Sequence, residues 1–182
     1  MEVIKTAIEG VVIIEPRIFK DARGYFFESF SQREFEEKVR KVNFVQDNES
    51  MSSYGVMRGL HFQRPPYTQS KLVRCVKGKV LDVVVDIRKG SPTYMKWVAV
   101  ELNEDNKKML FIPKGCLHGF VTLTENVEVS YKVDEYYSPE NDRSVCFCDP
   151  EIGVEWGIEN PVLSEKDKNA PLLKNSDVEF EF

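Results

Sequence analysis

Two histidines are the only imidazoles in this 182-residue chain, and one of them, His61, lies between Leu60 and Phe62 in "RGLHFQ". An unperturbed histidine titrates near neutral pH, so His61 can act as a general base. Lys71 follows ten residues later, at the start of the next expected strand, which would make the two side chains neighbours across a hairpin. A cation there would stabilise an enolate formed beside a ketone. The same pattern also fits a core histidine and an edge-strand charge.

Four further side chains could take part in chemistry, and each has an ordinary structural explanation as well. His118 follows "IPKGCL" and could contact a ligand or serve as a turn histidine bonded to backbone. Tyr131 fits a half-buried strand tyrosine, and Asp167 fits a helix-capping carboxylate. Arg23 in "DARGYF" fits a turn charge. The residues alone leave both interpretations open.

Other kinds of site lack their sequence patterns. No His-x-His motif occurs, and "CFC" at 146–148 lacks the Cys-x-x-Cys spacing of zinc knuckles. Neither a Gly-rich phosphate loop nor a dinucleotide fingerprint is present. We therefore expect an enzyme without a metal or cofactor.

The composition predicts a single globular domain over residues 1–182, with 42% hydrophobic and 30% charged residues. A net charge of −5 argues against nonspecific binding to nucleic acid or anionic membranes. The chain starts Met-Glu-Val, without a basic and then apolar leader, so we expect no signal peptide. Four cysteines in a chain of this size suggest reduced thiols and a cytoplasmic location.

Short β-strand patterns dominate the chain, as in a β-sandwich or small barrel. In 79–87, one face carries only apolar residues, and the other alternates valine with aspartate, so this strand should be covered on both sides. A capping box at Ser31 predicts a helix over 31–42, and a second, short helix should begin after Ser164. The expected architecture is a jelly-roll β-barrel with peripheral helices. Further strands are expected within 10–16, 24–30, 71–77, 96–103, 107–115, 118–124 and 127–137.

The motifs occur in an order that resembles the dTDP-4-dehydrorhamnose 3,5-epimerase family over nearly the whole chain. They are "DARGYFFESF", "FVQDNESMSSYGVMRGLHFQ", "KLVRCVKGKVLDVVVDIRKGSPTY", "FIPKGCLHGF", "YKVDEYYSP" and "LSEKDKNAP". The resemblance implies a metal-free cupin jelly roll that acts on a dTDP-4-keto-6-deoxyhexose. It further implies a homodimer in which N-terminal strands are exchanged and the sites are shared.

The resemblance also implies a role for each candidate residue. His61 would be the base, Asp167 its hydrogen-bonding partner, Tyr131 the acid on the opposite face and Lys71 the cation beside the C4 carbonyl oxygen. Arg58 would contact the diphosphate and His118 the sugar–phosphate region, while Gln46, Asp47 and Asn48 would lie along the nucleotide. Arg23 and Glu28 would reach the thymidine site of the neighbouring subunit. Asp142 and Lys166 align with further ligand contacts.

The sequence departs from the common family pattern at Asp142, at Cys116 with Leu117, and at Phe147, all of which could affect the wall of the sugar pocket. Three other functions remain as alternatives. One is an epimerase that inverts only C3 or only C5, another is a jelly roll that binds sugar nucleotides without catalysis, and the last is a metal-dependent oxygenase. The combination of base, acid and orienting carboxylate disfavours mere binding, and the missing ligand set disfavours the oxygenase.

Overall fold

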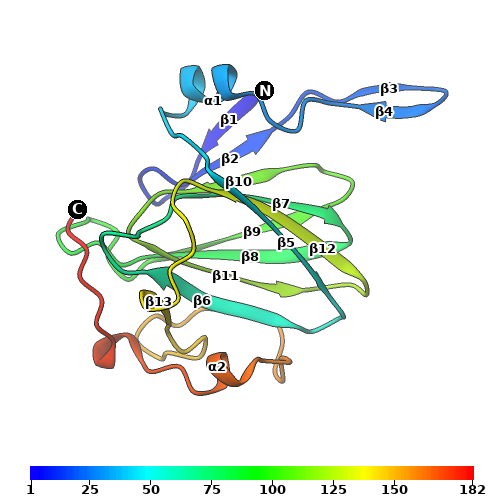
Figure 1. The fold of residues 1–182 in the computed structure, drawn as a ribbon. Coiled ribbons are helices and arrows are strands. Elements are labelled where there is room, and N and C mark those ends of the chain that lie inside the picture. Colours follow the sequence, from blue (N-terminus) through cyan, green and yellow to red (C-terminus); the bar gives the residue numbers. More distant parts are fainter.

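Two antiparallel sheets face each other in the computed structural model, which describes residues 1–182 (Figure 1). The six-stranded sheet has the order β1 (Glu2–Lys5), β2 (Val12–Glu15), β10 (Met109–Ile112), β7 (Lys71–Lys77), β12 (Val127–Val133) and β5 (Gln46–Ser52). The five-stranded sheet has the order β13 (Asp142–Ser144), β6 (Met57–Gln63), β11 (Cys116–Thr122), β8 (Lys79–Asp86) and β9 (Trp97–Asn103). A separate hairpin pairs β3 (Phe19–Asp21) with β4 (Gly24–Phe26) and projects from the sandwich. The mainly-β prediction is confirmed.

The alternation of side chains along β8 explains how the sandwich is filled. Val80 and Val84 point into the core between the sheets, together with apolar residues of β7, β10, β11 and β12. Val83 and Val85 point the other way and pack beneath the C-terminal segment, which contributes Trp156 among others. This strand is therefore covered on both faces, as predicted.

A third apolar cluster covers the outer face of the six-stranded sheet. It is built on Phe35 of α1 (Gln32–Lys38), whose ring lies edge-on to Phe111 with 5.3 Å between centroids. Val42 and the partly buried Val39, which follow the helix, join this cluster. The helix itself is shorter than the predicted 31–42. It ends at Lys38, with Val39 as the C-cap.

The C-terminal segment contains α2 (Glu165–Lys168) and a 3-10 turn (Leu173–Asn175). Ser164 caps α2 as expected, and its hydroxyl accepts a hydrogen bond from the amide of Asp167 at 3.1 Å. Because the serine provides the cap, the Asp167 carboxylate is available for other contacts.

Two expectations about strand pairing are wrong. The strands β6 and β7 belong to different sheets, so His61 and Lys71 are not hairpin neighbours. The strand expected in 24–30 ends at Phe26, because β4 pairs only with the three residues of β3. In addition, no helix in the structure has the length and apolar character required to cross a membrane.

Candidate active site

A cavity of about 530 Å³ is lined by residues of both sheets and of the segment around α2. Directly paired residues on neighbouring strands project to the same face of a sheet. His118 pairs with His61 across β11 and β6, and Tyr131 pairs with Asn48 across β12 and β5. Of the predicted site residues, those that line this cavity are Asn48, Arg58, His61, Lys71, His118, Tyr131, Lys166 and Asp167.

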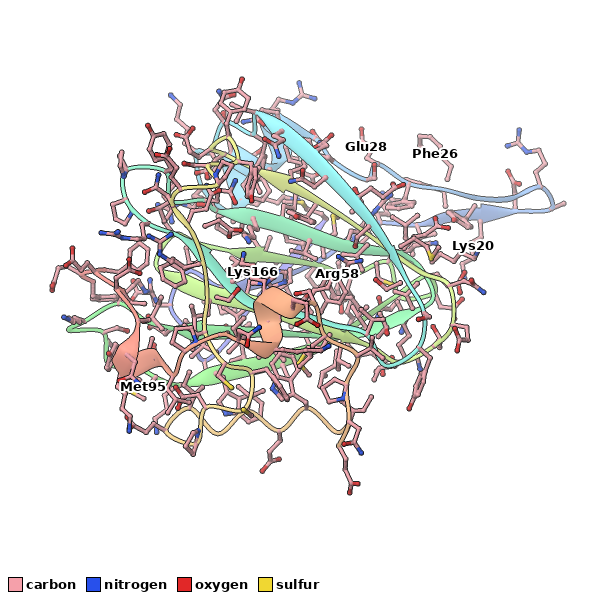
Figure 2. All side chains as sticks on the ribbon, turned by 60° about the horizontal axis from the view of Figure 1, so that its bottom comes forward. Lys20, Phe26, Glu28, Arg58, Met95 and Lys166 are labelled. Atoms are coloured by element: carbon pink, nitrogen blue, oxygen red, sulfur yellow. The ribbon has the colours of Figure 1, made fainter.

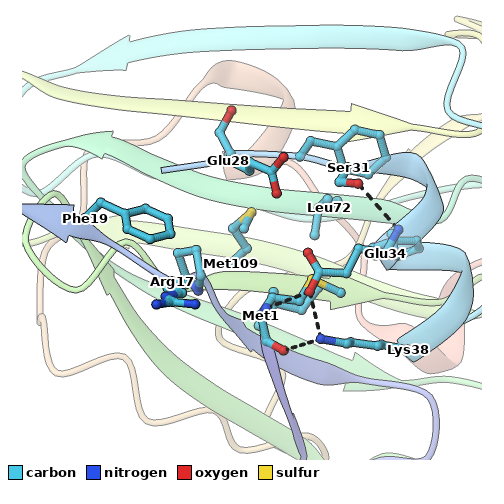
Figure 3. A pocket seen from close by; sticks show the side chains of 14 residues that line it. Met1, Arg17, Phe19, Glu28, Ser31, Glu34, Lys38, Leu72 and Met109 are labelled. Carbon is cyan, nitrogen blue, oxygen red and sulfur yellow. Dashed lines mark hydrogen bonds and ion pairs between the residues drawn. The ribbon is translucent and has the colours of Figure 1, made fainter. Parts of the chain in front are cut away.

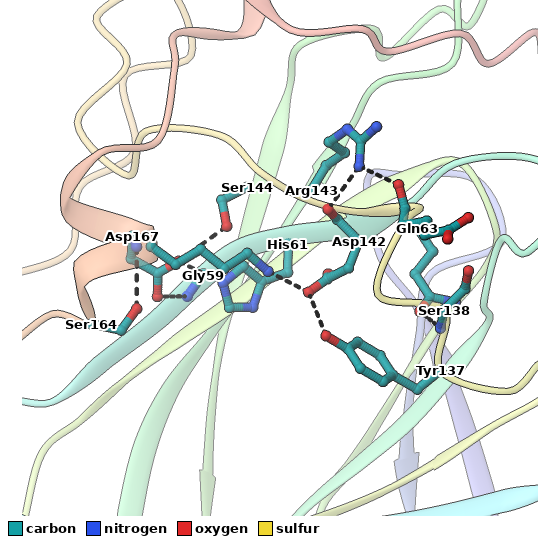
Figure 4. A network of polar contacts seen from close by, with 12 residues as sticks. Gly59, His61, Gln63, Tyr137, Ser138, Asp142, Arg143, Ser144, Ser164 and Asp167 are labelled. Atoms are coloured by element: carbon teal, nitrogen blue, oxygen red, sulfur yellow. Dashed lines mark hydrogen bonds and ion pairs between the residues drawn. The ribbon is translucent and has the colours of Figure 1, made fainter.

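His61 and Asp167 form a hydrogen-bonded pair at the wall of the cavity (Figure 4). Nε2 of His61 lies 2.6 Å from Oδ1 of Asp167, whose carboxylate also accepts bonds from the Ser144 hydroxyl at 3.2 Å and the Gly59 amide at 3.3 Å. Burial opposes ionisation of this carboxyl, but the hydrogen bonds outweigh it and hold the pKa of Asp167 below its ordinary value. An ionised carboxylate can only accept, so Nε2 carries the proton and Nδ1 is left as the basic atom.

Lys71 reaches the cavity from the opposite sheet, which is why it lies near His61 without being its hairpin partner. Burial lowers the pKa of its ammonium group to about 8, and the negative charges of Asp142 and Asp82 oppose this shift. Its Nζ lies 5.8 Å from the centroid of the Tyr131 ring. The cavity therefore contains a cation that water solvates poorly and that can stabilise an oxyanion.

Tyr131 lies on β12 and is partly buried against the core. Burial raises the pKa of its phenol, and the charge of Asp142 adds to this, while the charge of Arg58 opposes it. The phenol is thus protonated at neutral pH and can donate a proton.

His118 lies within β11 and not in a turn, and only 6% of the residue is exposed. Its Nε2 lies 2.9 and 3.0 Å from the two carboxylate oxygens of Asp82, a fully buried residue of β8. The turn interpretation is wrong, because the histidine bonds a carboxylate and not the backbone. This second histidine–aspartate pair lies beside the first, since His118 and His61 are paired in register.

Charged side chains border the cavity. Lys166, on α2, is ion-paired with Asp142 of β13, and the Tyr137 hydroxyl donates to the same carboxylate at 3.4 Å (Figure 4). Arg58 is held by the Ser52 hydroxyl at 3.1 Å and keeps an exposed guanidinium group. In Figure 2, Arg58 and Lys166 lie close to α2, in the middle of the view.

Five predicted contact residues lie outside the cavity lining, and one of them is Asp142, the ion-pair partner of Lys166. Arg23 is in the turn of the β3–β4 hairpin, where it pairs with Asp21 at 2.6 Å. Glu28 lines a different cavity beside the N-terminus and α1, shown in Figure 3, and Figure 2 places it toward the projecting hairpin. Gln46 bonds Asn48 at 2.8 Å, whereas Asp47 projects to the other face and pairs with Lys132 at 3.0 Å.

Three contributors to the site were not predicted from the sequence. Asp82 had a signal, since an acid within the β-branched run "VLDVVVD" must be buried and needs a partner. Ser144 and the Gly59 amide had none, because their bonds to Asp167 join segments that are distant in sequence.

Comparison with known proteins identifies the family. The sequence profile of dTDP-4-dehydrorhamnose 3,5-epimerase matches residues 5–175. This chain belongs to that family. It is 53% identical to the dTDP-4-dehydrorhamnose 3,5-epimerase of Shigella flexneri, over 97% of this chain and 98% of that protein.

Solved structures agree with this family and with the cupin-type fold. One is a dTDP-6-deoxy-D-glucose-3,5-epimerase from Legionella pneumophila in complex with dTDP-4-keto-L-rhamnose, with a TM-score of 0.93 and 46% identity over 97% of this chain and 94% of that one. Another is a double mutant of a 3'-monoepimerase from Streptomyces bikiniensis in complex with dTDP, with a TM-score of 0.88 and 34% identity over 94% of this chain and 87% of that one.

Proposed function

We propose that this protein inverts C3 and C5 of dTDP-4-dehydro-6-deoxy-D-glucose to give dTDP-4-dehydro-L-rhamnose. The observation that carries the proposal is the convergence of a base, an acid and a poorly solvated cation, from both sheets, on one cavity. Inversion at carbon requires a base on one face and an acid on the other. A ketone at C4 acidifies both neighbouring carbons, so one site can serve C3 and C5.

In the proposed mechanism, Nδ1 of His61 removes the proton while Asp167 fixes the tautomer and stabilises the imidazolium, as in a serine-protease triad. Lys71 stabilises the enolate oxygen, and Tyr131 returns a proton from the opposite face. A positioned acid or base typically contributes about 10²–10⁴-fold to the rate. The Streptomyces bikiniensis double mutant supports the pairing, because its substituted histidine and tyrosine are seventy residues apart, like His61 and Tyr131.

The substrate contacts belong to the proposal as well. Arg58 and His118 would meet the diphosphate and the sugar–phosphate region, and Gln46, Asp47 and Asn48 would lie along the nucleotide. Asp142 and Lys166 would contact the sugar end, and their ion pair at the cavity edge supports this placement.

We also propose a cytoplasmic homodimer with shared sites. Arg23 and Glu28 lie away from the cavity of their own chain, as expected if they serve the site of a second copy. An equal mixture of Arg23→Ala and His61→Ala proteins should recover activity as subunits exchange, because one type of mixed site is then intact. A fully active monomer in sedimentation would contradict the shared site.

Proton NMR in D₂O tests the reaction directly. With dTDP-4-keto-6-deoxyglucose as substrate, deuterium should enter at both C3 and C5, and the product should be the L-rhamno ketone. Deuterium and inversion at one carbon alone would support the single-centre alternative. Binding without exchange at either carbon would favour a non-catalytic module.

A further inference from the structure

Lys107 is a buried cation next to the β3–β4 hairpin. Only 8% of the residue is exposed, and no carboxylate forms an ion pair with it. By contrast, its neighbour Lys108 pairs with Glu15 at 3.0 Å. A buried ammonium group without a counter-charge is costly unless other groups replace its hydration.

Aromatic residues of the hairpin segment replace it. Nζ of Lys107 donates a hydrogen bond to the Tyr25 hydroxyl at 2.9 Å and lies 4.3 Å from the centroid of the same ring. The Phe27 ring is 6.0 Å away, and the Arg74 guanidinium lies 5.6 Å from that ring. These distances are within the range of cation–π attraction. Lys107 and Arg74 therefore both contact the aromatic segment formed by Tyr25 and Phe27, at the end of β4.

These contacts matter because β3 and β4 pair only with each other. No strand ladder joins the hairpin to either large sheet, so side-chain contacts at its base contribute to the direction in which it leaves the sandwich. Within the hairpin turn, Arg23 is already held by Asp21 through its backbone and side chain. The turn of the hairpin is therefore fixed internally, and the contacts at its base act on the orientation of the whole hairpin relative to the two sheets.

The backbone at Lys107 supports a specific role. Its φ is +53°, a left-handed conformation that residues with a side chain adopt infrequently. The turn is fixed by a bond from the Lys107 amide to the Asn103 carbonyl at 3.2 Å. Conformations of this kind persist where the surrounding structure imposes them, often near functional segments.

We infer that Lys107 is a positioning residue that orients the β3–β4 hairpin so that Arg23 reaches the sugar-nucleotide cavity of a second copy. This inference rests on the proposed function, in which the site is shared. Figure 2 shows Phe26 and Lys20 on the projecting hairpin, and 68% of Phe26 is exposed. Lys107 acts through the hairpin and does not touch the reacting atoms.

A set of three variants tests this role. Lys107→Met removes the charge and keeps the length, Lys107→Arg keeps the charge, and Lys108→Met is the control next to it. Lys107→Met should raise KM, and the Kd for dTDP measured by calorimetry, by about 5- to 30-fold, as loss of a desolvated cation–π contact implies. The value of kcat should remain within about twofold. Lys107→Arg should restore most of the affinity, and Lys108→Met should match the wild type.

Trypsin provides a readout that needs no turnover. Arg23 is exposed in the single chain and would be covered in the second copy's cavity, so a hairpin loosened from that cavity should be cut there several times faster in Lys107→Met than in the wild type or in Lys108→Met. Unchanged affinity for dTDP, or unchanged cleavage, would overturn the inference. Equal losses in kcat and affinity that Lys107→Arg fails to restore would also overturn it, since they indicate a merely structural residue. Failure of the proposed reaction is distinct, because it removes turnover but leaves dTDP affinity and cleavage measurable.

Discussion

Replacing Lys71 with methionine should abolish epimerisation and at the same time make the folded protein more stable. Burial lowers the pKa of this lysine from 10.5 to about 8, even though Asp142 and Asp82 favour the charged form. At 1.36 kcal/mol per pKa unit, the charged side chain therefore costs the folded state up to about 3 kcal/mol at neutral pH. Lys71 is partly exposed in the open cavity and is therefore partly screened, so we expect a gain of about 1–3 kcal/mol.

The sign of the pH dependence follows from proton counting. Between about pH 8 and 10.5 the unfolded chain holds the Lys71 proton more firmly than the folded chain, so the contribution of Lys71 to stability rises with pH. The penalty is complete below pH 8 and is lost as pH rises through 10.5. The advantage of Lys71→Met should therefore be largest near pH 7 and should shrink toward pH 10.

Urea unfolding of both proteins at pH 7 and pH 10 measures this difference, and Lys166→Met is the control because its cation borders the same cavity but is exposed. A Lys71→Met protein less stable than the wild type at pH 7 would refute the reasoning. A gain that does not change with pH would refute it equally.

Three further predictions concern Lys71, Asp167 and Asp86, a buried carboxylate at the end of β8. The kcat/KM of the wild type should fall above about pH 8, where Lys71 loses its proton in the free enzyme, and a rate profile will show this. Asp167→Asn should lower kcat by about 10²–10⁴-fold in steady-state assays without unfolding the protein. Ser144→Ala removes only one hydrogen bond to the same carboxylate and should lower kcat by about 5-fold. Burial opposes ionisation of Asp86, yet bonds from Arg88 and its neighbours hold its pKa at about 2. Asp86→Asn should thus lose about 2 kcal/mol in urea unfolding at pH 7, a loss that disappears as pH falls from about 4 through 2.

Local patterns in the sequence were sufficient for several elements. The alternation in β8 reveals a strand buried on both faces, and the Ser164 cap locates α2, because both depend on residues close together in the chain. The end of α1 was missed: the helix stops at Lys38 without a glycine or proline, and Val42 beyond it packs with residues of the six-stranded sheet, a contact between segments distant in sequence.

The site illustrates the limit of local reasoning. The proximity of Lys71 to His61 was expected from a hairpin, but it arises because β6 and β7 lie on opposite walls of one cavity. Which strands face each other depends on the order of the whole sandwich, and ten residues of sequence do not contain that information. For the same reason Ser144 could not be anticipated, whereas the buried Asp82 left a visible signal in an apolar strand.

Solvent exchange in two variants tests the division of roles most directly. Each is incubated with dTDP-4-keto-6-deoxyglucose in D₂O, and deuterium at C3 and C5 is followed by NMR. His61→Ala should show neither exchange nor inversion, because the base is gone. Tyr131→Phe should lose inversion but retain some deuterium incorporation, because His61 can remove a proton and return a deuteron to the same face. A Tyr131→Phe protein without exchange, beside a His61→Ala protein that still exchanges, would contradict the mechanism.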